Sequence, residues 1–251
     1  MKGAVSLETV TIEGRQPVLE ALKAGRHIKR VLIIKGSTGG IIDKIQGQAK
    51  RSKIEVLNVH QAKFEAVAKT RSHQGVIAEA LPIEYVGVKE ILNSCPKGGH
   101  PFILVLDQIQ DPQNFGSIIR TADAAGVHGI IIPKKNSVQI TPGVEKASAG
   151  AVQYVPVAQS NIAQALDFFQ GQGCWVMGAD MDGPKEYFEM DFNIPLVLVI
   201  GSEDRGMRRL VKKKCDHLVR IPQFGKINSL NAANAASILM YEVLRQRLQK
   251  Q

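Results

Sequence analysis

Amides, a carboxylate, a guanidinium and a hydroxyl gather in three loops of the second half of the chain, each directly after an apolar run. The loops span residues 107–120, 200–206 and 221–231, and their candidate residues are Asn114, Arg120, Glu203, Ser229 and Asn231. In open α/β sheets, the loops that follow strands are where ligands bind. These groups could hold a polar substrate, bind a phosphate through the guanidinium and position a loop through the carboxylate.

The third loop closes a short apolar strand and leads into the last long helix. Pro222 ends regular strand pairing, and Gly225 permits a backbone conformation that other residues avoid. Ser229 and Asn231 lie near the helix start, where short polar side chains cap free N–H groups. The same N–H groups and the helix dipole can hold an anion or the polar edge of a ligand. The loop alone is therefore compatible with a plain cap and with an active-site loop.

The elements that position these loops follow from the apolar pattern after residue 100. Runs such as residues 196–200 are apolar throughout, which is typical of a parallel sheet buried on both faces. We predict an open α/β domain over residues 100–251. Its predicted strands are 102–106, 129–132, 154–157, 175–179, 196–200 and 217–221, and its predicted helices are 116–125, 162–170 and 230–248.

A smaller α/β unit is predicted over residues 1–81, and the stretch 82–99, which ends in Pro and Gly residues, is the predicted linker. The unit's predicted strands are 31–34, 55–59 and 75–79, with helices near Pro17, at 41–51 and at 61–68. Residues 1–98 contain 16 Lys and Arg against 9 Asp and Glu, which is +7 of the formal charge of +9. A small basic unit joined to a nearly neutral one indicates a module that binds a polyanion.

Several common functions lack their sequence signals. The chain has no Gly-Lys-Ser/Thr phosphate loop, Ser148 lacks the flanking glycine of a nucleophile elbow, and six His show no metal spacing. We therefore expect no metal. Cys95, Cys174 and Cys215 fit neither a disulfide framework nor a zinc site and are expected to be reduced thiols. No apolar run approaches the roughly 20 residues that span a membrane, so we expect a cytosolic protein without membrane contact.

Taken together, the three loops resemble the SpoU (TrmH-type) group of the SPOUT superfamily of RNA ribose 2′-O-methyltransferases. The matching stretches are Asp111-Pro-Gln-Asn-Phe-Gly-Ser-Ile-Ile-Arg-Thr121, Gly201-Ser-Glu-Asp-Arg-Gly206 and Ile221-Pro through Ser229-Leu-Asn231. The first unit is similar to the substrate-binding domain of the branch that modifies a guanosine of large-subunit ribosomal RNA, through Ile12-Glu-Gly-Arg-Gln-Pro-Val-Leu-Glu-Ala-Leu22 and Ser72-His-Gln-Gly75. The chain departs from the family pattern at Ala232-Ala-Asn-Ala-Ala-Ser237, where a more apolar, valine-bearing run is usual.

This resemblance implies a catalytic domain with a deep trefoil knot, S-adenosylmethionine as the cofactor, and a homodimer whose contact involves the last helix. The family pattern places the cofactor against backbone groups of Gly201, Ile221 and Leu230. Its functional positions fall on Asn114, Arg120, Glu203, Ser229 and Asn231. Because a guanidinium is ordinarily only a donor, the identity of the general base stays open, with Arg120, Ser229 and water as candidates.

The RNA substrate has two candidates. The extra basic unit favours a large folded ribosomal RNA over transfer RNA, and RNA is favoured over DNA because only RNA supplies the 2′-hydroxyl. A different class of function is also open: a ribosome-assembly factor that keeps the fold and binds RNA without methyl transfer.

Overall fold

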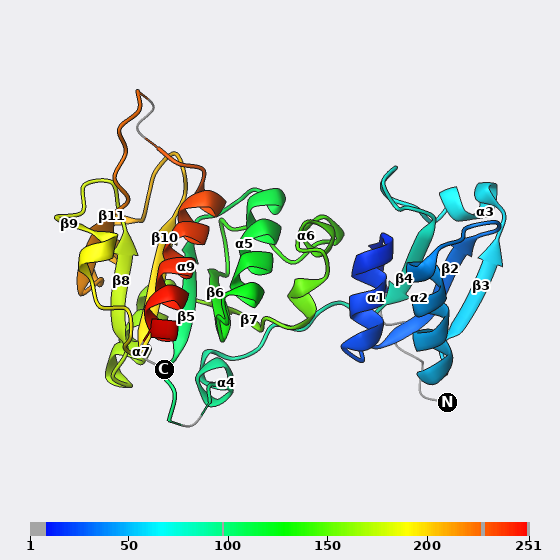
Figure 1. Cartoon of the computed structure of the whole chain (residues 1–251), viewed down its shortest axis with the longest axis horizontal. Helices are drawn as coiled ribbons and strands as arrows, with labels where there is room; N and C mark the ends of the chain where they lie inside the picture. The colour runs from blue at the N-terminus through cyan, green and yellow to red at the C-terminus, as the bar shows by residue number, and fades with distance from the viewer. Residues whose placement is uncertain (1–8, 97, 227–228, 250–251) are drawn as a thin grey trace. The chain divides into compact units, whose positions relative to one another are not determined.

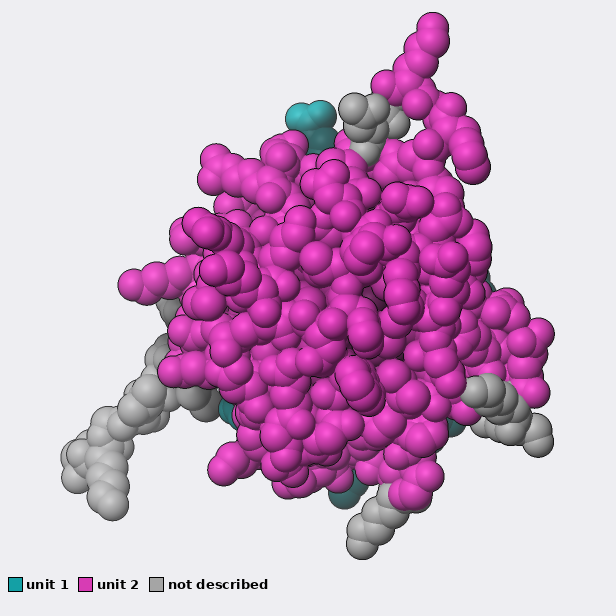
Figure 2. All heavy atoms as spheres, turned by 90° about the vertical axis from the view of Figure 1, so that its left-hand side faces the viewer, with its two compact units in different colours: residues 1–84, 140–154 teal, residues 85–139, 155–251 magenta. Residues whose placement is uncertain are grey.

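The computed structural model describes residues 9–96, 98–226 and 229–249. Two compact units make up these residues. The first combines residues from 1–84 with residues 140–154, and the second combines residues 85–139 with residues from 155–251 (Figure 2). The chain therefore passes from one unit to the other three times, at 84–85, 139–140 and 154–155.

The first unit is a four-stranded sheet with helices on both faces. Its elements are β1 Val10–Glu13, α1 Arg15–Lys23, β2 Ile28–Ile34, α2 Gly40–Arg51, β3 Glu55–Val59, α3 Gln61–Glu65 and β4 Val76–Ala80. The strand order is β1-β4-β2-β3; only β2 and β3 run parallel. Alternating strand residues point to opposite faces, so Val31 and Ile33 pack under α1 and α2 whereas Leu32 packs with Phe64 of α3.

The segment 140–154, which lies between two strands of the second unit in sequence, is part of the first unit. It forms α6 Pro142–Ala147 and a short 3-10 helix, Ala151–Gln153. Glu145 accepts a 2.6 Å hydrogen bond from Arg26, and Arg26 also donates to the Leu81 carbonyl. Both charged side chains are more than nine-tenths buried. Burial raises the pKa of the Glu145 carboxyl, and the hydrogen bond from Arg26 acts in the opposite direction.

The second unit is built on a seven-stranded sheet in which every described strand pair is parallel. The strands are β5 Phe102–Asp107, β6 Gly129–Pro133, β7 Val157–Ser160, β8 Trp175–Ala179, β9 Lys185–Glu186, β10 Leu196–Gly201 and β11 His217–Arg220. Their order in the sheet is β7-β6-β5-β10-β8-β11-β9. The predicted open α/β fold is confirmed.

Helices cover both faces of this sheet. They are α4 Val88–Asn93, α5 Pro112–Ala124, α7 Ile162–Gly171, α8 Arg209–Lys213 and α9 Ala232–Gln249, with a 3-10 turn at Tyr187–Glu189. On one face, α4, α7 and α8 pack over Ile103, Val105 and Val199. On the other, α9 packs along α5 and against β10 (Figure 1). The apolar strands are therefore buried on both faces, as parallel sheets require.

Some predicted boundaries are wrong. The strand predicted at 154–157 lies at 157–160, because Pro156 directly precedes it and Tyr154 follows the short 3-10 helix. The helix predicted at 116–125 is α5, which begins at Pro112, because the Asp111 side chain caps it by accepting from Asn114 N. Neither β1, β9, α6 nor α8 was predicted. Gly225 lies at a bend, and its φ is not positive.

The Arg26–Glu145 pair gives a test of how segment 140–154 is held. Replacing Glu145 by Gln leaves the buried Arg26 charge without its counter-ion, so we expect the free energy of unfolding of the first unit to fall by about 3 kcal/mol. Urea unfolding and hydrogen exchange over residues 140–154 would measure the loss. The control is Lys23→Gln, which breaks the more exposed Lys23–Glu20 pair and should cost less than about 1 kcal/mol. Equal effects of the two substitutions would contradict this account.

Candidate active site

The candidate site lies at the carboxyl ends of four neighbouring strands, β5, β10, β8 and β11. From β5 the chain first builds the sheet outwards through β6 and β7, and later adds β8, β10 and β11 on the other side of β5. Loops at such a reversal diverge and leave a crevice between them. The three loops singled out from the sequence follow β5, β10 and β11, so the topology brings them to this crevice.

Glu203 joins the three loops. Its Oε1 accepts a 3.0 Å hydrogen bond from Asn114 Nδ2 and a 2.8 Å bond from the backbone N–H of Ala232, the first residue of α9. Asn231 Nδ2 donates both to Glu203 Oε1 and to Asn114 Oδ1, the latter at 2.9 Å. A carboxylate at a helix N-terminus is favoured by the helix dipole. One side chain therefore fixes the relative positions of all three loops.

The two asparagines are also held by the helices they precede or begin. Asn114 N donates to the Asp111 side chain at 2.8 Å in the first turn of α5. Asn231 caps α9, because its Oδ1 accepts from the backbone N–H groups of Ala233 and Asn234 at 3.0 and 3.3 Å. The cap expected at Asn231 is therefore present. In the same conformation, the Asn231 amide nitrogen donates hydrogen bonds to Glu203 and Asn114.

A second interaction, which the sequence did not reveal, holds the loop after β10 against the end of β5. Asp107 is fully buried and accepts from the Arg208 backbone N–H and Nε, both at 2.8 Å, with Arg208 Nη2 at 2.7 Å. The guanidinium contacts Oδ1 and the backbone N–H contacts Oδ2, so both carboxylate oxygens of Asp107 are held by one residue. The signal for it was an aspartate that directly ends an apolar strand, where a buried carboxylate needs a partner.

Gly201 is required by the loop's own backbone. A Cβ at this position would lie 2.3 Å from Gly206 C and 2.4 Å from Met207 N, distances that no side chain allows. Ser202 and Gly206 form a backbone bridge across the loop, with Gly206 at φ 62°. Glycine at 201 thus lets the loop turn back over the strand end and present Glu203.

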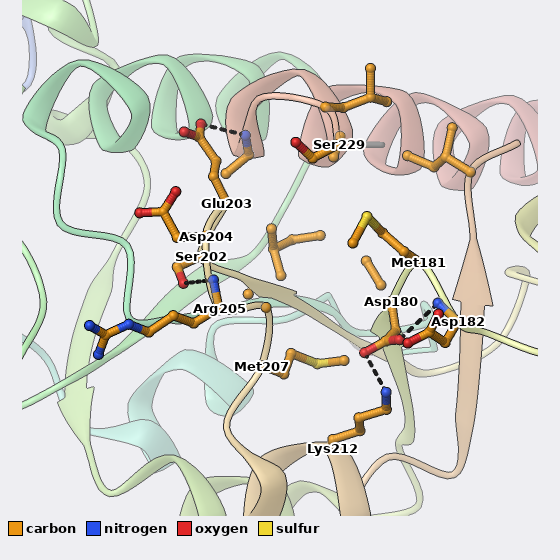
Figure 3. Close-up of a pocket in the computed structure, with 18 of the residues that line it drawn as sticks. Asp180, Met181, Asp182, Ser202, Glu203, Asp204, Arg205, Met207, Lys212 and Ser229 are labelled. Carbon is orange, nitrogen blue, oxygen red and sulfur yellow. Dashed lines mark hydrogen bonds and ion pairs between the residues drawn. The ribbon is translucent and has the colours of Figure 1, made fainter. Parts of the chain in front are cut away.

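A cavity of about 320 Å³ lies beside this loop (Figure 3). All three residues predicted to bind the cofactor, Gly201, Ile221 and Leu230, line it, and so do Glu203 and Ser229. In Figure 3, Ser229 and Glu203 lie at the end of the cavity next to the start of α9. Two of the three loops, 200–206 and 221–231, therefore line one cavity, and Glu203 connects them to the loop after β5.

The cavity combines an apolar surface with carboxylates. Ile200, Met207, Val219, Ile221 and Leu230 supply the apolar part, and Asp180, Asp182 and Asp204 also line it. Asp180 pairs with Lys212 at 2.8 Å, and this hydrogen bond raises the pKa of the Lys212 ammonium. An apolar surface with nearby carboxylates suits a ligand that has a planar apolar part and positive charge.

The thiols near the sheet are not reactive. Burial raises the pKa of Cys215 to about 12 and that of Cys174 to about 11, so neither forms a thiolate at neutral pH. The cysteines are free, as expected. Among the described residues no group of His, Cys, Asp and Glu could hold a metal ion, and no described helix is long and apolar enough to span a membrane.

Among the residues that the structure describes, Arg120 is the one predicted site residue that neither lines the cavity nor joins the hydrogen-bond network around Glu203. It follows Asn114 by six residues on α5, which places it roughly 9 Å further along the helix and about 120° around it. Its side chain is exposed and has no hydrogen-bond or ion-pair partner among the residues that the structure describes. Asn114, Glu203, Ser229 and Asn231 are thus assembled within one chain, whereas Arg120 is not.

Comparisons with known proteins agree with this arrangement. The SpoU rRNA Methylase family matches residues 101–241, and the family described as RNA 2′-O ribose methyltransferase substrate binding matches residues 11–86. The chain belongs to the SpoU methylase family. The resemblance of the three loops is thereby confirmed, and the protein is an RNA methyltransferase.

Relatives match over almost the whole chain. The TrmH family tRNA/rRNA methyltransferase YacO of Bacillus subtilis is 42% identical over 236 residues, which cover 93% of this chain and 94% of the relative. A Staphylococcus haemolyticus protein described in the same way is 44% identical, with 97% and 98% covered. The crystal structure of an AdoMet-bound rRNA methyltransferase from Sinorhizobium meliloti is 26% identical, with a TM-score of 0.78 and 94% and 87% covered. The SpoU methylase fold is thus confirmed along the chain.

The role of Glu203 in this SpoU methylase can be tested directly. Glu203→Gln removes the charge and one acceptor oxygen, so the three loops lose charge-assisted hydrogen bonds and we expect a loss of about 2 kcal/mol in the free energy of unfolding. Hydrogen exchange at the start of α9 should accelerate. Asp204→Asn is the matched control, because its carboxylate has no partner among the described residues, and its effect should stay within about 0.5 kcal/mol. A loss of equal size in both variants would show that Glu203 does not hold the loops.

Proposed function

We propose that this enzyme methylates the 2′-hydroxyl of a ribose in RNA with S-adenosylmethionine as the cofactor, and that its target is a guanosine of large-subunit ribosomal RNA. The observation that carries the proposal is the position of Glu203. This residue belongs both to the wall of the 320 Å³ cavity and to the network that fixes Asn114 and Asn231. A ligand in the cavity therefore lies against the side chains that the family resemblance marks as functional.

The residues of the cavity fit this cofactor. Ile221, Leu230 and Val219 offer an apolar surface for an adenine ring, and the backbone at Ile221 and Leu230 lies in loop conformation outside any helix or strand. Asp182 supplies negative charge toward a ligand that carries a sulfonium and an ammonium group. A relative, the Sinorhizobium meliloti rRNA methyltransferase, was crystallised with AdoMet. The proposal includes the family's deep trefoil knot, which accounts for the meeting of the late loop 221–231 with the earlier loop 201–206.

The chain's residues act mainly by positioning. When bound, the cofactor supplies an electrophilic methyl group whose C–S bond breaks, leaving its electron pair on sulfur, as a bond to the ribose oxygen forms. Asn114, Asn231 and Glu203 hold the loops that bring the two reactants into line. We assign to Arg120 the binding of the phosphate or hydroxyl, because its guanidinium remains a donor. The hydroxyl proton then leaves through Ser229 to water.

Arg120 reaches the site through a homodimer in this proposal. Ile238, Tyr241 and Leu248 are large apolar residues exposed along one side of α9, and the fractions exposed for Tyr241 and Leu248 are 52% and 60%. Thr121 and Ser237 share a hydrogen bond between α5 and α9, so Arg120 and Ile238, their chain neighbours, lie near the same contact. A two-fold contact along α9 would cover the apolar stripe and bring Arg120 to an interface.

Ribosomal RNA is preferred over transfer RNA on the extent of the structural matches. The match to the Sinorhizobium meliloti rRNA methyltransferase covers 94% of this chain, whereas the match to the A. aeolicus TrmH/SpoU tRNA modifying enzyme covers 65%. The first unit also carries most of the net positive charge, which favours a large folded RNA. As part of the same proposal, residues 1–81 form the RNA-binding domain, 82–99 connect it to the catalytic domain 100–251, and the enzyme works in the cytosol.

Methyl transfer from labelled S-adenosylmethionine tests the function. We expect label in a 2′-O-methylated nucleoside of unmodified large-subunit ribosomal RNA, and much less in transfer RNA. Arg120→Lys keeps the charge but loses the planar fork, so kcat should fall about 100-fold. Affinity for S-adenosylhomocysteine should be unchanged, because Arg120 does not line the cavity.

The control for this experiment is Arg209→Lys, which makes the same change at an exposed arginine at the start of α8. It should methylate like the wild type. Full activity of a folded Arg120→Lys enzyme would refute the assigned role of Arg120. Cofactor binding without label in any RNA would instead favour a non-catalytic RNA-binding factor.

The dimer has its own test. Tyr241→Glu places a charge in the exposed stripe of α9, so we expect the mass measured by analytical ultracentrifugation to fall from that of a dimer to that of a monomer, with loss of methyl transfer. Leu210→Glu is the control, because Leu210 is equally exposed, at 59%, but lies on α8 at the opposite face of the sheet. A wild-type monomer, or a dimer that survives Tyr241→Glu, would show that α9 is not the contact.

A further inference from the structure

A second cavity, of about 250 Å³, lies on the other side of the loop 202–205. It shares Ser202, Glu203, Asp204, Arg205 and Ala232 with the first cavity, and its remaining wall is formed by residues 108–111 and Asn114. The same four-residue loop therefore separates the two spaces. A molecule in the second cavity lies against the network of Glu203 and Asn114 from the side opposite the cofactor.

The lining of the second cavity contains polar groups that the protein itself does not use. The side chains of Gln108, Gln110, Asp204 and Arg205 have no hydrogen-bond or ion-pair partner among the described residues. Asn114 and Glu203, in contrast, are fully engaged with one another and with α9. Two amides, a carboxylate and a guanidinium thus remain available to a ligand from one small space.

The backbone holds Gln108 in place. Its φ is 67°, in the left-handed region that costs a residue with a side chain about 1 kcal/mol. On one side lies Asp107, locked by Arg208. On the other, the buried Ile109 carbonyl accepts from Val138 N at 2.9 Å and from Ser137 Oγ at 3.2 Å. The backbone position from which the Gln108 side chain extends is therefore set before any ligand arrives.

These groups match a nucleotide. A side-chain amide can donate and accept hydrogen bonds at the same time, which suits it to recognise the edge of a base. A guanidinium binds phosphate. A carboxylate accepts best from two neighbouring N–H donors, which among the RNA bases only the pairing edge of guanine offers. Unpaired bases in RNA are read on these edges by side chains.

We propose that this recess, formed by residues 108–111 and 202–205, receives the target nucleotide. Gln108, Gln110 and Asp204 contact the base, and Arg205 binds its phosphate. The inference rests on the proposed function, because it assumes that a ribose is brought between the two cavities. It adds the residues that determine which nucleotide is methylated on its ribose.

The test uses the full-length enzyme with unmodified large-subunit ribosomal RNA and labelled cofactor, followed by digestion to nucleosides. For the variant Gln108→Ala/Gln110→Ala, we expect kcat/KM for RNA to fall at least about tenfold. Loss of a good hydrogen-bonded contact to a base lowers the rate constant by about this factor. Affinity for S-adenosylhomocysteine should stay within about twofold of the wild type, since neither glutamine lines the first cavity. Gln164→Ala, an exposed glutamine on α7 without a side-chain partner among the described residues, is the matched control.

Two milder variants keep the test decisive if the double variant is unstable. Gln110→Ala changes only an exposed side chain, and Gln108→Asn keeps an amide in a residue that tolerates positive φ. Each should lower kcat/KM for RNA or spread the label over more than one nucleoside. Unchanged rate and unchanged labelled nucleoside in these variants would overturn the inference and leave the proposed function intact.

Two further results would also decide against the recess. Loss of S-adenosylhomocysteine affinity in the glutamine variants would assign the second cavity to the cofactor. A wild-type enzyme that binds S-adenosylhomocysteine and labels no RNA would refute the proposed function itself, and the inference with it. The wild-type reaction therefore separates failure of the function from failure of the recess.

Discussion

The site depends on one carboxylate oxygen. Oε1 of Glu203 accepts from Asn114, from Asn231 and from the first backbone N–H of α9, three groups that lie 28 to 89 residues from Glu203 in the chain. Besides this carboxylate, the loops are connected by the hydrogen bond from Asn231 to Asn114 and by the Asp107–Arg208 pair. The helix dipole favours the negative charge at this place, and the asparagines provide the remaining donors. Glu203, Asn114 and Asn231 therefore hold the loops together by hydrogen bonds, whatever contact they make with a substrate.

The second constraint is the close approach of α9 to α5. It explains why the stretch 232–237 contains small residues where the family pattern has a more apolar, valine-bearing run. Ala232, Ala233 and Ala236 of α9 are buried, and Ser237 bonds to Thr121 of α5. Small side chains in the first turns of α9 let this helix start directly above Glu203 and lie along α5. A valine-bearing run would need more space at the same contact. The alanines therefore preserve the packing that the cap at Asn231 and the network around Glu203 require.

The sequence alone located the elements and loops that depend on residues close together in the chain. Continuous apolar runs located most strands of the second unit, and polar residues directly after them located the three loops that Glu203 joins. Prediction from the sequence failed for features that depend on contacts between residues far apart in the chain. Arg26 and Glu145 are 119 residues apart, so no local pattern assigns segment 140–154 to the first unit. The burial of Asp107 beneath Arg208 is equally non-local. The six-residue spacing already places Asn114 and Arg120 on different sides of a helix, but the sequence did not show that the Arg120 side lies away from the cavity. At Tyr154, apolar character alone suggested a strand that Pro156 displaces.

The loop 202–205 forms a wall of both cavities, and this has a thermodynamic consequence. Any movement of these four residues changes both spaces at once, because Ser202, Glu203, Asp204 and Arg205 line each of them. On the proposed function, one face of the loop contacts the cofactor and the other contacts the target nucleotide. A ligand that orders the loop for one cavity then also orders it for the other, and such coupling is reciprocal. Glu203 is suited to transmit it, since the carboxylate that bounds both cavities also ties the loop to α5 and α9. On the proposed function, the same short loop therefore affects both the choice of base and the binding of the cofactor. The hydrogen bond from Arg208 to Asp107 holds the end of this loop against β5.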